Sequence, residues 1–300
     1  MADNESASPR RRRLGQLLRN LRESTGMTGE QAAARVGWSA AKVSRIETAK
    51  TLPSEDDISI LADLYKVDEA THQGARKLRH DAVQKGWWEK YGDSLDQGFG
   101  VFVGLEAEAT TLRNWEPQVI PGLLQIEDYA RALMENTMQP IVQIPPTWQR
   151  DRLEVRMRRQ QMHLFSKDPL QLLAVLDEGT LGRRVAAPDV MSRQLQHLLK
   201  ISELGHIEIR VISRMTPSPV NSAPFVHFKF DDFPDTVYLE VLEGSRYLSD
   251  VQQVYYYERV FDHLMGVALD EGSSRHLINE HLRSWQAAAC LDQEKESASQ

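Results

Sequence analysis

The chain has 300 residues, of which 41% are hydrophobic and 26% charged, with a mean hydropathy of −0.47. This composition is typical of a globular protein of one or two domains, and no apolar run approaches the roughly 18 to 20 residues that span a bilayer. We therefore expect no membrane association. The single cysteine, Cys290, cannot form an internal disulfide, so we expect a cytoplasmic protein.

The charge is distributed unevenly along the chain. Residues 10–50 contain ten Lys or Arg and three acidic residues, a net charge of +7, whereas the whole chain carries −7, so the remaining residues carry −14. Lys and Arg attract phosphate, and an acidic surface elsewhere limits indiscriminate adhesion to nucleic acid. The segment favours an anionic polymer as partner. The plain alternative is a solvated charged surface with a basic tail.

The N-terminal part of the sequence predicts a basic arm followed by a small helical domain. Residues 1–13 lack periodicity, and we expect a disordered arm that ends in Arg10, Arg11, Arg12 and Arg13. Residues 14–80 show apolar side chains at helical spacing in five short stretches. Gly26 and Gly37 separate the first three stretches. The predicted caps of the second and third helices are Thr28 and Ser39, and Pro53 and Ser54 open the fourth.

The third of these helices begins with unusually small side chains. Its sequence, WSAAKVSRIETAK over residues 38–50, places Ser39, Ala40 and Ala41 in the first turn, while Val43 and Ile46 form the opposite apolar face. Packing against a core does not require a first turn without bulk. Such a helix end allows a large molecule to approach closely.

The run LRNLRESTGMTGEQAAARVGWSAAKVSRIETAKTLPSEDDISILADLYKV resembles the helix-turn-helix domain of the Xre family, the phage-repressor-like DNA-binding proteins. The resemblance implies that the third helix enters the major groove of double-stranded DNA while the second crosses the backbone. On this basis the predicted DNA-binding residues are Thr28, Gly29, Ser39, Ala40, Ala41, Lys42, Ser44, Arg45 and Lys50, together with Arg10, Arg11, Arg12 and Arg13.

Individual roles follow from side-chain chemistry. Arg45 is suited to a bidentate contact with guanine, and the alternative is a surface arginine paired with a nearby acid. Ala40 and Ala41 offer apolar contact to a thymine methyl. Lys42, Ser44 and Lys50 are expected to contact phosphate or the edge of the groove.

Two further expectations come from the resemblance alone. It implies that Arg22 pairs with Glu47 inside the domain. The family often has Gln at the start of the second helix, where this sequence has Gly29. One side-chain anchor to phosphate is therefore missing, although backbone N–H groups at a helix start also bind phosphate.

Residues 85–287 predict an α+β domain, with a sheet of at least four strands flanked by helices. The expected strands lie near 170–177, 207–213, 224–231 and 236–242. The expected helices lie near 101–112, 126–134, 147–165, 190–204, 250–269 and 273–287, with a turn at 116–117 and a disordered tail at 288–300.

The C-terminal region carries several short motifs in a fixed order. They are WW, PGLLQ, YARAL, RMRRQ, VLDEGTLGRR and the segment from YLSD to HLMGVAL. This order resembles the C-terminal domain of a group of actinobacterial Xre-type regulators of poorly defined activity. The resemblance implies regulation and a small partner protein encoded nearby, and it indicates no ligand or cofactor.

The segment HFKFDDFPD is the best candidate for catalysis. His227 and Lys229 match the start of the H-x-K-x4-D motif of phospholipase-D-like enzymes, in which two such histidines act on a phosphodiester. Pro234 stands where an acidic residue could complete the motif, and the chain has no second copy. We therefore expect a polar strand face, no enzymatic activity and no metal site. A DNA-targeted phosphodiesterase and a non-DNA adaptor remain as alternatives.

The helix near 250–269 carries a wide apolar stripe. We expect this surface to pack on the domain's own sheet and also to hold a second chain or a partner, which predicts a homodimer. Core packing alone is the alternative. The residues of the stripe are Val254, Tyr257, Phe261, Leu264, Met265 and Ala268.

Overall fold

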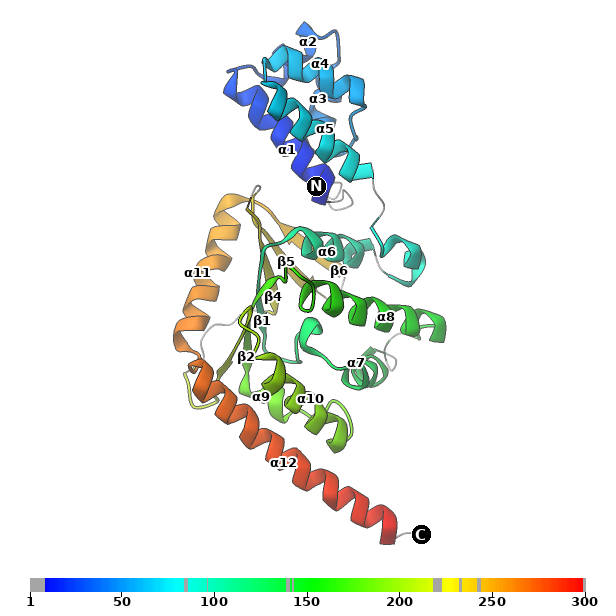
Figure 1. The fold of residues 1–300 in the computed structure, drawn as a ribbon, viewed down its shortest axis with the longest axis vertical. Helices are drawn as coiled ribbons and strands as arrows, with labels where there is room; N and C mark the ends of the chain where they lie inside the picture. The colour runs from blue at the N-terminus through cyan, green and yellow to red at the C-terminus, as the bar shows by residue number, and fades with distance from the viewer. Residues whose placement is uncertain are drawn as a thin grey trace. The chain divides into compact units, whose positions relative to one another are not determined.

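The computed structural model describes residues 9–83, 86–95, 97–138, 141, 143–217, 223–231, 234–241 and 244–298. The chain divides into two compact units, one comprising Met1–Gly92 and Asp96–Glu108 and the other Asp93–Leu95 and Ala109–Gln300. The predicted fold class is confirmed: a helical N-terminal region precedes an α+β domain (Figure 1). Within the described ranges, no helix is long and apolar enough to cross a membrane.

The first unit begins with the five helices that the sequence predicts. Short connections join them. The turn between the first and second helices contains Gly26, the turn between the second and third contains Gly37, and both glycines have a positive φ. The helices are α1 (Pro9–Ser24), α2 (Gly29–Arg35), α3 (Ala40–Glu47), α4 (Glu55–Tyr65) and α5 (Glu69–Val83), followed by η1 (Glu89–Ser94) and α6 (Gln97–Glu108).

The predicted helix starts are confirmed by their hydrogen bonds. Thr28 and Gln31 form a reciprocal capping box at α2, and the hydroxyl of Ser39 accepts from the backbone N–H of Lys42 at 3.2 Å. Ser54 and Asp57 form a second capping box at α4. Each cap satisfies N–H groups that a helix start leaves without partners.

The expectation of a disordered arm is wrong for residues 9–13. Helix α1 starts at Pro9, which suits a first helical position because proline has a fixed φ and lacks an N–H. Arg10 donates to Glu108 at 2.7 Å and to the carbonyl of Asp81 at 3.2 Å, contacts that the local sequence could not indicate. Residues 1–8 of the expected arm lie outside the described residues.

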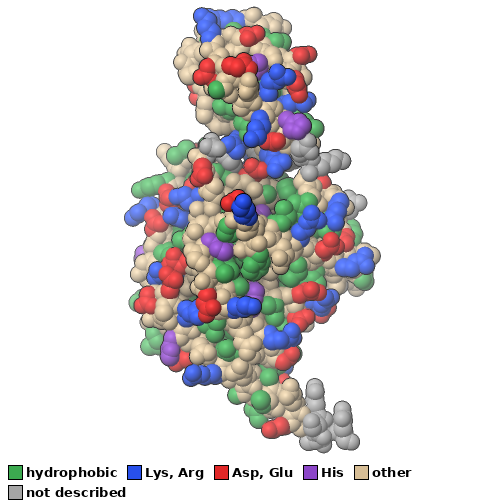
Figure 2. Space-filling view, in the orientation of Figure 1, with side chains coloured by type: hydrophobic (Ala, Val, Ile, Leu, Met, Phe, Trp, Pro, Cys, Tyr) green, Lys and Arg blue, Asp and Glu red, His purple; other side chains and the backbone are tan. Residues whose placement is uncertain are grey.

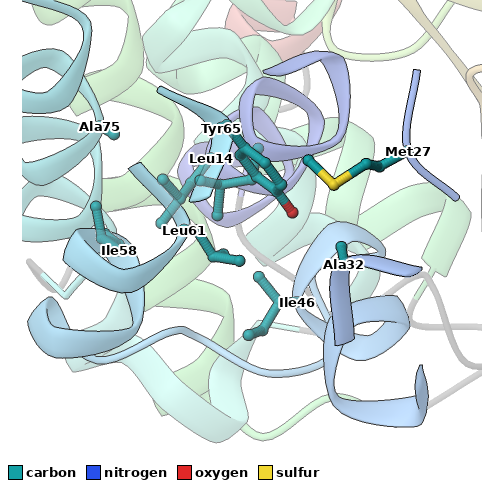
Figure 3. Packing of buried hydrophobic residues seen from close by; sticks show 9 residues of the cluster. Leu14, Met27, Ala32, Ile46, Ile58, Leu61, Tyr65 and Ala75 are labelled. Atoms are coloured by element: carbon teal, nitrogen blue, oxygen red, sulfur yellow. The ribbon is translucent and has the colours of Figure 1, made fainter. Parts of the chain in front are cut away.

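Each of the five helices contributes at least one side chain to the core of the first unit (Figure 3). Helix α1 also crosses the end of α3 very closely at Gly15. A Cβ on Gly15 would lie 2.7 Å from the carbonyl oxygen of Glu47 and 2.8 Å from that of Ile46. Glycine is therefore needed there for contact between two backbones. The buried cluster comprises Leu14, Leu18, Met27, Ala32, Ile46, Ile58, Leu61, Tyr65 and Ala75.

The second unit contains a six-stranded mixed sheet with the order β3-β2-β1-β4-β5-β6. The first three strands are parallel, and the other three continue from β1 as an antiparallel meander. Four of these strands were predicted. The bounds are β1 (Thr111–Glu116), β2 (Gln171–Asp177), β3 (Ile207–Ile212), β4 (Phe225–Lys229), β5 (Thr236–Val241) and β6 (Gly244–Leu248).

Strands β1 and β6 were not predicted from the sequence. The helix expected over 101–112 ends at Glu108, and the residues from Thr111 onward form the central strand instead of approaching a turn. Leu112 and Trp115 are 2% and 3% exposed because β2 and β4 flank them and helices cover both faces. A strand defined by such distant partners carries little local signal.

Helices cover the sheet on both sides, with α11 on one face and α7, α8 and α10 on the other (Figure 1). The other predicted helices of this unit are confirmed, and all of their ends except that of α12 lie within a few residues of the expected positions. The short α9 was not predicted. The elements are η2 (Gly122–Leu124), α7 (Glu127–Leu133), η3 (Met134–Met138), α8 (Pro146–His163), α9 (Glu178–Gly182), α10 (Pro188–Ile201), α11 (Val251–Val267) and α12 (Glu271–Ala298).

The structure corrects one expectation about the last helices and confirms part of another. Helix α12 continues to Ala298, so the expected disordered tail from residue 288 is helical as far as the description extends. The stripe on α11 lies in the apolar layer over the sheet, where it packs with Trp115 and Phe225. Phe261 and Leu264 are buried there and the other four residues of the stripe are partly buried, so packing on the sheet is confirmed and a partner role for the stripe stays a prediction. The residues concerned are Val254, Tyr257, Phe261, Leu264, Met265 and Ala268.

Candidate nucleic-acid interface

Helix α3 has one buried and one exposed face. Val43 and Ile46 are each 1% exposed and point into the core, as Figure 3 shows for Ile46. The opposite face is exposed and consists of small or polar side chains around one arginine, which leaves the first turn open to close approach. The exposed residues are Ser39, Ala40, Ala41, Ser44, Arg45 and, just beyond the helix, Lys50.

Arg45 is the one long cationic side chain on the exposed part of α3 itself. Within the described part of the chain, its guanidinium makes no ion pair or hydrogen bond. The alternative of a surface arginine paired with a nearby acid is therefore not seen there. All of its N–H donors are available to a ligand, and they form the planar fork that matches the N7 and O6 atoms of guanine.

Lys42 lies on the same helix but already has two partners. Its Nζ atom lies 2.6 Å from a carboxylate oxygen of Asp57 and 3.7 Å from the centre of the Trp38 ring. Burial tends to raise the pKa of Asp57, but hydrogen bonds from Lys42 and Ser54 outweigh it and leave that pKa below its ordinary value. The pair links α3 to the start of α4. A phosphate contact by Lys42 stays a prediction, since the structure shows this lysine in use inside the unit.

The pairing of Arg22 with Glu47 is confirmed. The guanidinium donates to both carboxylate oxygens at 2.7 and 2.9 Å and to the carbonyl oxygen of Met27 at 2.6 Å. The hydrogen bond that Arg22 donates to Glu47 is the main cause of the raised pKa of Arg22. Because Arg22 is only 8% exposed, this bidentate pair fixes the end of α3 to α1 in a partly dehydrated site. Together with the Lys42 pair, it holds the helix at both ends.

The start of α2 supplies the other predicted contacts. Thr28 is exposed, but its hydroxyl caps the helix, and the side chain of Gln31 accepts from the N–H of Thr28. A Cβ built on Gly29 meets no atom within 4 Å. The absence of a side chain there therefore has no steric cause in this unit, and a longer residue has room to reach a phosphate.

The four arginines at the start of α1 are less free than a disordered arm would make them. Arg10 is bound to Glu108, and Arg11, Arg12 and Arg13 are half-buried and also make interactions within the protein. Contact with DNA by these four side chains stays a prediction. These arginines belong to a helix and not to a flexible arm, so the prediction no longer depends on flexibility.

The catalytic candidate of the second unit lies under α11, with His227 buried and Lys229 partly exposed. His227 is 0% exposed, and its Nε2 atom lies 2.9 Å from a carboxylate oxygen of Asp235. Lys229 donates to Glu258 of α11 at 3.0 Å, and this bond is the main cause of the lowered pKa of Glu258. Arg113 of β1 lies 3.3 Å from Asp262 on the same helix. These side chains form a charged layer that fastens α11 to the sheet.

Two family models match the chain. A model described as a helix-turn-helix domain matches residues 13–73. A model described as a domain of unknown function, DUF5753, matches residues 99–280, which is more than half of the chain. The chain belongs to the DUF5753 family. No curated protein and no solved structure matches it significantly.

The DUF5753 region contains a buried polar network that the sequence analysis did not identify. Gln125 is 2% exposed, donates to the carbonyl of Ile120 at 2.6 Å and accepts from Arg156 at 2.5 Å. Gln160 and Gln194 donate to the carbonyls of Gln125 and Leu124 at 2.5 and 2.7 Å. These bonds give partners to backbone carbonyl groups in the irregular segment between β1 and α7, where burial without a hydrogen bond would be costly.

Sequence signals for this network were present in the PGLLQ and RMRRQ motifs, whose glutamines are the buried residues. Burial, followed by the nearby charge of Arg159, lowers the pKa of Arg156 to about 10. Burial also raises the pKa of Glu116 to about 7 at the end of β1. The visible face of this unit shows acidic and basic side chains interspersed rather than one basic patch (Figure 2). The features that fit nucleic acid are therefore in the helix-turn-helix domain.

Proposed function

We propose that this protein is a sequence-specific, DNA-binding transcriptional regulator of the Xre type. The observation that carries the proposal is the exposed face of α3, where small side chains surround an arginine that has no partner among the described residues. The helix-turn-helix match over residues 13–73 supports it. Because the regulator acts on DNA, we place it in the cytoplasm.

In the proposed complex, the first turn of α3 enters the major groove. Ala40 and Ala41 allow the helix to approach the base edges, and Arg45 forms a bidentate contact with a guanine. Ser39, Ser44 and Lys50 lie where they would contact phosphates beside the groove. The Arg22 and Lys42 pairs contribute by holding α3 in place before DNA arrives, which lowers the entropic cost of binding.

We propose a regulatory role for the DUF5753 domain: it binds a partner protein or an effector and brings two chains together. Support comes from the second, separately packed unit, whose best catalytic candidate is buried and hydrogen-bonded. One α3 reads only a few base pairs, so a second copy on an adjacent half-site is needed for a unique site. We assign no cofactor and no enzymatic activity to the domain.

The test of DNA recognition is a binding titration with the full chain. A binding sequence is first selected from random oligonucleotides, and each position is then varied in turn. Arg45→Ala is expected to cost about 1 to 3 kcal/mol on the selected sequence and to relax the preference at one base pair. The matched control is Arg131→Ala, which removes an exposed arginine from α7 and should leave binding unchanged.

Two results would contradict the proposal. Failure of the unmodified protein to select any sequence would remove the DNA-binding function. An equal loss on every sequence for Arg45→Ala would leave DNA binding intact but would assign this arginine to a phosphate.

A further inference from the structure

An open groove of about 560 Å³ lies in the second unit between strand β6 and the first turns of α11. Its walls include Leu248 of β6 and Tyr256 and Tyr257 of α11. Tyr257 turns toward the core, where its ring packs against Phe225 at 5.0 Å. Tyr256 faces outward and is 66% exposed. The groove marks the place where α11 leaves the margin of the sheet uncovered.

The groove lies beside an edge of the sheet that no described strand pairs with. Strand β6 is the last strand in the order, and among the described residues only β5 pairs with it. Its outer edge therefore presents backbone donors and acceptors to a further strand. The ring of Tyr256, which lines the groove beside this strand, is also exposed. Exposed apolar and aromatic groups next to a sheet edge are typical of protein contacts.

Two side chains of opposite charge, Arg246 and Asp250, line the groove. Arg246 is exposed and makes no ion pair with any described residue. In Asp250, Oδ1 caps α11 by accepting from the N–H groups of Gln252 and Gln253 at 3.1 Å each, and Oδ2 has no partner within the described ranges. The two side chains line the same groove without forming an ion pair with each other. One surface thus carries both a free cation and a free anionic oxygen.

We propose that this groove is the contact between two copies of the chain, related by a two-fold axis near Leu248. A two-fold contact requires a self-complementary surface, because residue i of one copy meets residue j of the other and the reverse also holds. Arg246 and Asp250 are equally spaced in sequence on either side of Leu248. The axis therefore brings Arg246 of each copy opposite Asp250 of the other and forms two equivalent ion pairs.

The same arrangement uses the other exposed groups. The edges of the two β6 strands face each other across the axis, and Leu248 meets its own copy. Tyr256 then packs beside the joined edges and loses its exposure to water. The inference rests on the proposed function in one respect: it identifies the surface that joins two chains of the regulator. It also replaces the core-facing stripe of α11 as the candidate interface.

The test is the oligomeric state of the full chain, measured by sedimentation velocity over about a 100-fold range of concentration, because association depends on concentration. The unmodified protein is expected to be a dimer. Arg246→Asp places two acids opposite each other, and Asp250→Arg places two arginines opposite each other. Each variant should raise the dimer dissociation constant by about 100-fold or more. Mixing the two monomeric variants should restore dimers, because all ion pairs across the axis are then of opposite sign.

Controls separate the charge effect from folding. Asp250→Asn keeps an oxygen that can cap α11 and removes only the charge, so it should weaken the dimer less than Asp250→Arg does. Arg131→Asp introduces the same reversal on an exposed part of α7 and should leave the dimer intact. Thermal unfolding of each variant shows whether it is folded. If either reversal variant does not fold, Arg246→Gln and Tyr256→Ser serve instead, and both should weaken the dimer.

Each outcome has a defined meaning. Dimers that reappear only in the mixture support the two-fold contact. A monomeric unmodified protein, reversal variants that remain dimeric, or a mixture that remains monomeric would overturn it, and a stable complex with a different protein at this groove would do the same. DNA binding to a single half-site is measured in parallel. If the monomeric variants retain it, DNA recognition by α3 stands whatever the fate of the dimer contact.

Discussion

Helices α3 and α11 both show an apolar stripe beside polar side chains, yet their exposed faces are of opposite kinds. In α3 only Val43 and Ile46 are buried, and small groups around Arg45 face outward. In α11 the wide stripe packs on the sheet, and aromatic side chains at the start of the helix remain exposed. Periodicity therefore identifies which residues are buried, but the chemistry of the opposite face indicates what a helix binds.

The largest predicted effect tests how α3 is held. Glu47→Ala removes both oxygens to which the buried guanidinium of Arg22 donates at 2.7 and 2.9 Å and leaves Glu23, at 3.4 Å, as the carboxylate that it still contacts. This loss should destabilise the first unit by about 3 kcal/mol or more. Hydrogen exchange of the full chain should show the loss in α1 and α3 and little change in the sheet. Glu55→Ala is the control, because Glu55 forms only exposed ion pairs and its loss should cost less than about 1 kcal/mol. Equal effects from the two variants would contradict the structural role of the Arg22 pair.

The next effect concerns the second unit and depends on pH. Burial tends to raise the pKa of Glu178, but the bonds it accepts from Arg214, Ser213 and His281 outweigh burial and lower it to about 2. The depressed pKa means that this carboxylate stabilises the folded state above its ordinary pKa, and that the contribution is lost as the pH falls toward 2. Glu178→Gln should cost about 2 to 3 kcal/mol at pH 7.

The measurement for Glu178 is the free energy of unfolding between pH 7 and pH 2.5 for both proteins. The difference between them should shrink as the pH falls, since protonation removes the carboxylate from the unmodified protein. A difference that is constant over the whole range would mean that the charge of Glu178 contributes nothing.

A pair of glycine substitutions sharpens the comparison of tight and open surfaces within the first unit. Gly15→Ala forces α1 away from the backbone of α3 and should destabilise the unit by about 1 to 3 kcal/mol. Gly74→Ala, in α5, meets no atom within 4 Å and should stabilise the unit by about 0.4 to 1 kcal/mol. Chemical unfolding of the full chain measures both. Stabilisation by both substitutions would show that helix propensity, and not the α1 to α3 contact, decides the result.

The smallest effect adds a contact instead of removing one. Gly29→Gln restores the side chain that Xre-type domains often carry at the start of α2, and the structure leaves room for it. It should raise affinity about two- to five-fold for every DNA sequence alike, since phosphate contacts position the protein without reading bases. Gly29→Ala has no such reach and should leave affinity unchanged. A gain confined to one sequence would contradict this role.

Much of the first unit was predictable because its determinants are local. Caps at Thr28, Ser39 and Ser54 are each followed by the residues they bond, and the small first turn of α3 is visible in the sequence itself. The Arg22 pair was implied only by family resemblance, because its partners are 25 residues apart. The need for Gly15 was missed, since nothing local indicates that another backbone crosses there.

The second unit was less predictable because distant segments define it. Strand β1 is central only through pairing with residues 171–176 and 225–229, and its own residues, TLRNWE, do not alternate clearly. The stripe on α11 indicated which face packs on the sheet but not that only Phe261 and Leu264 would be fully buried. The groove beside β6 could not be foreseen, because β6 itself was not recognised.

The central claim is that Arg45 reads a guanine in the major groove. The most direct measurement is a cycle in which the unmodified protein and Arg45→Ala bind the selected site containing either guanine or 7-deazaguanine at the position that Arg45 specifies. Loss of N7 removes one of the two acceptors, so the unmodified protein should lose about 1 kcal/mol or more, and Arg45→Ala should lose nothing further. Equal losses for both proteins at every guanine of the site would contradict the claim.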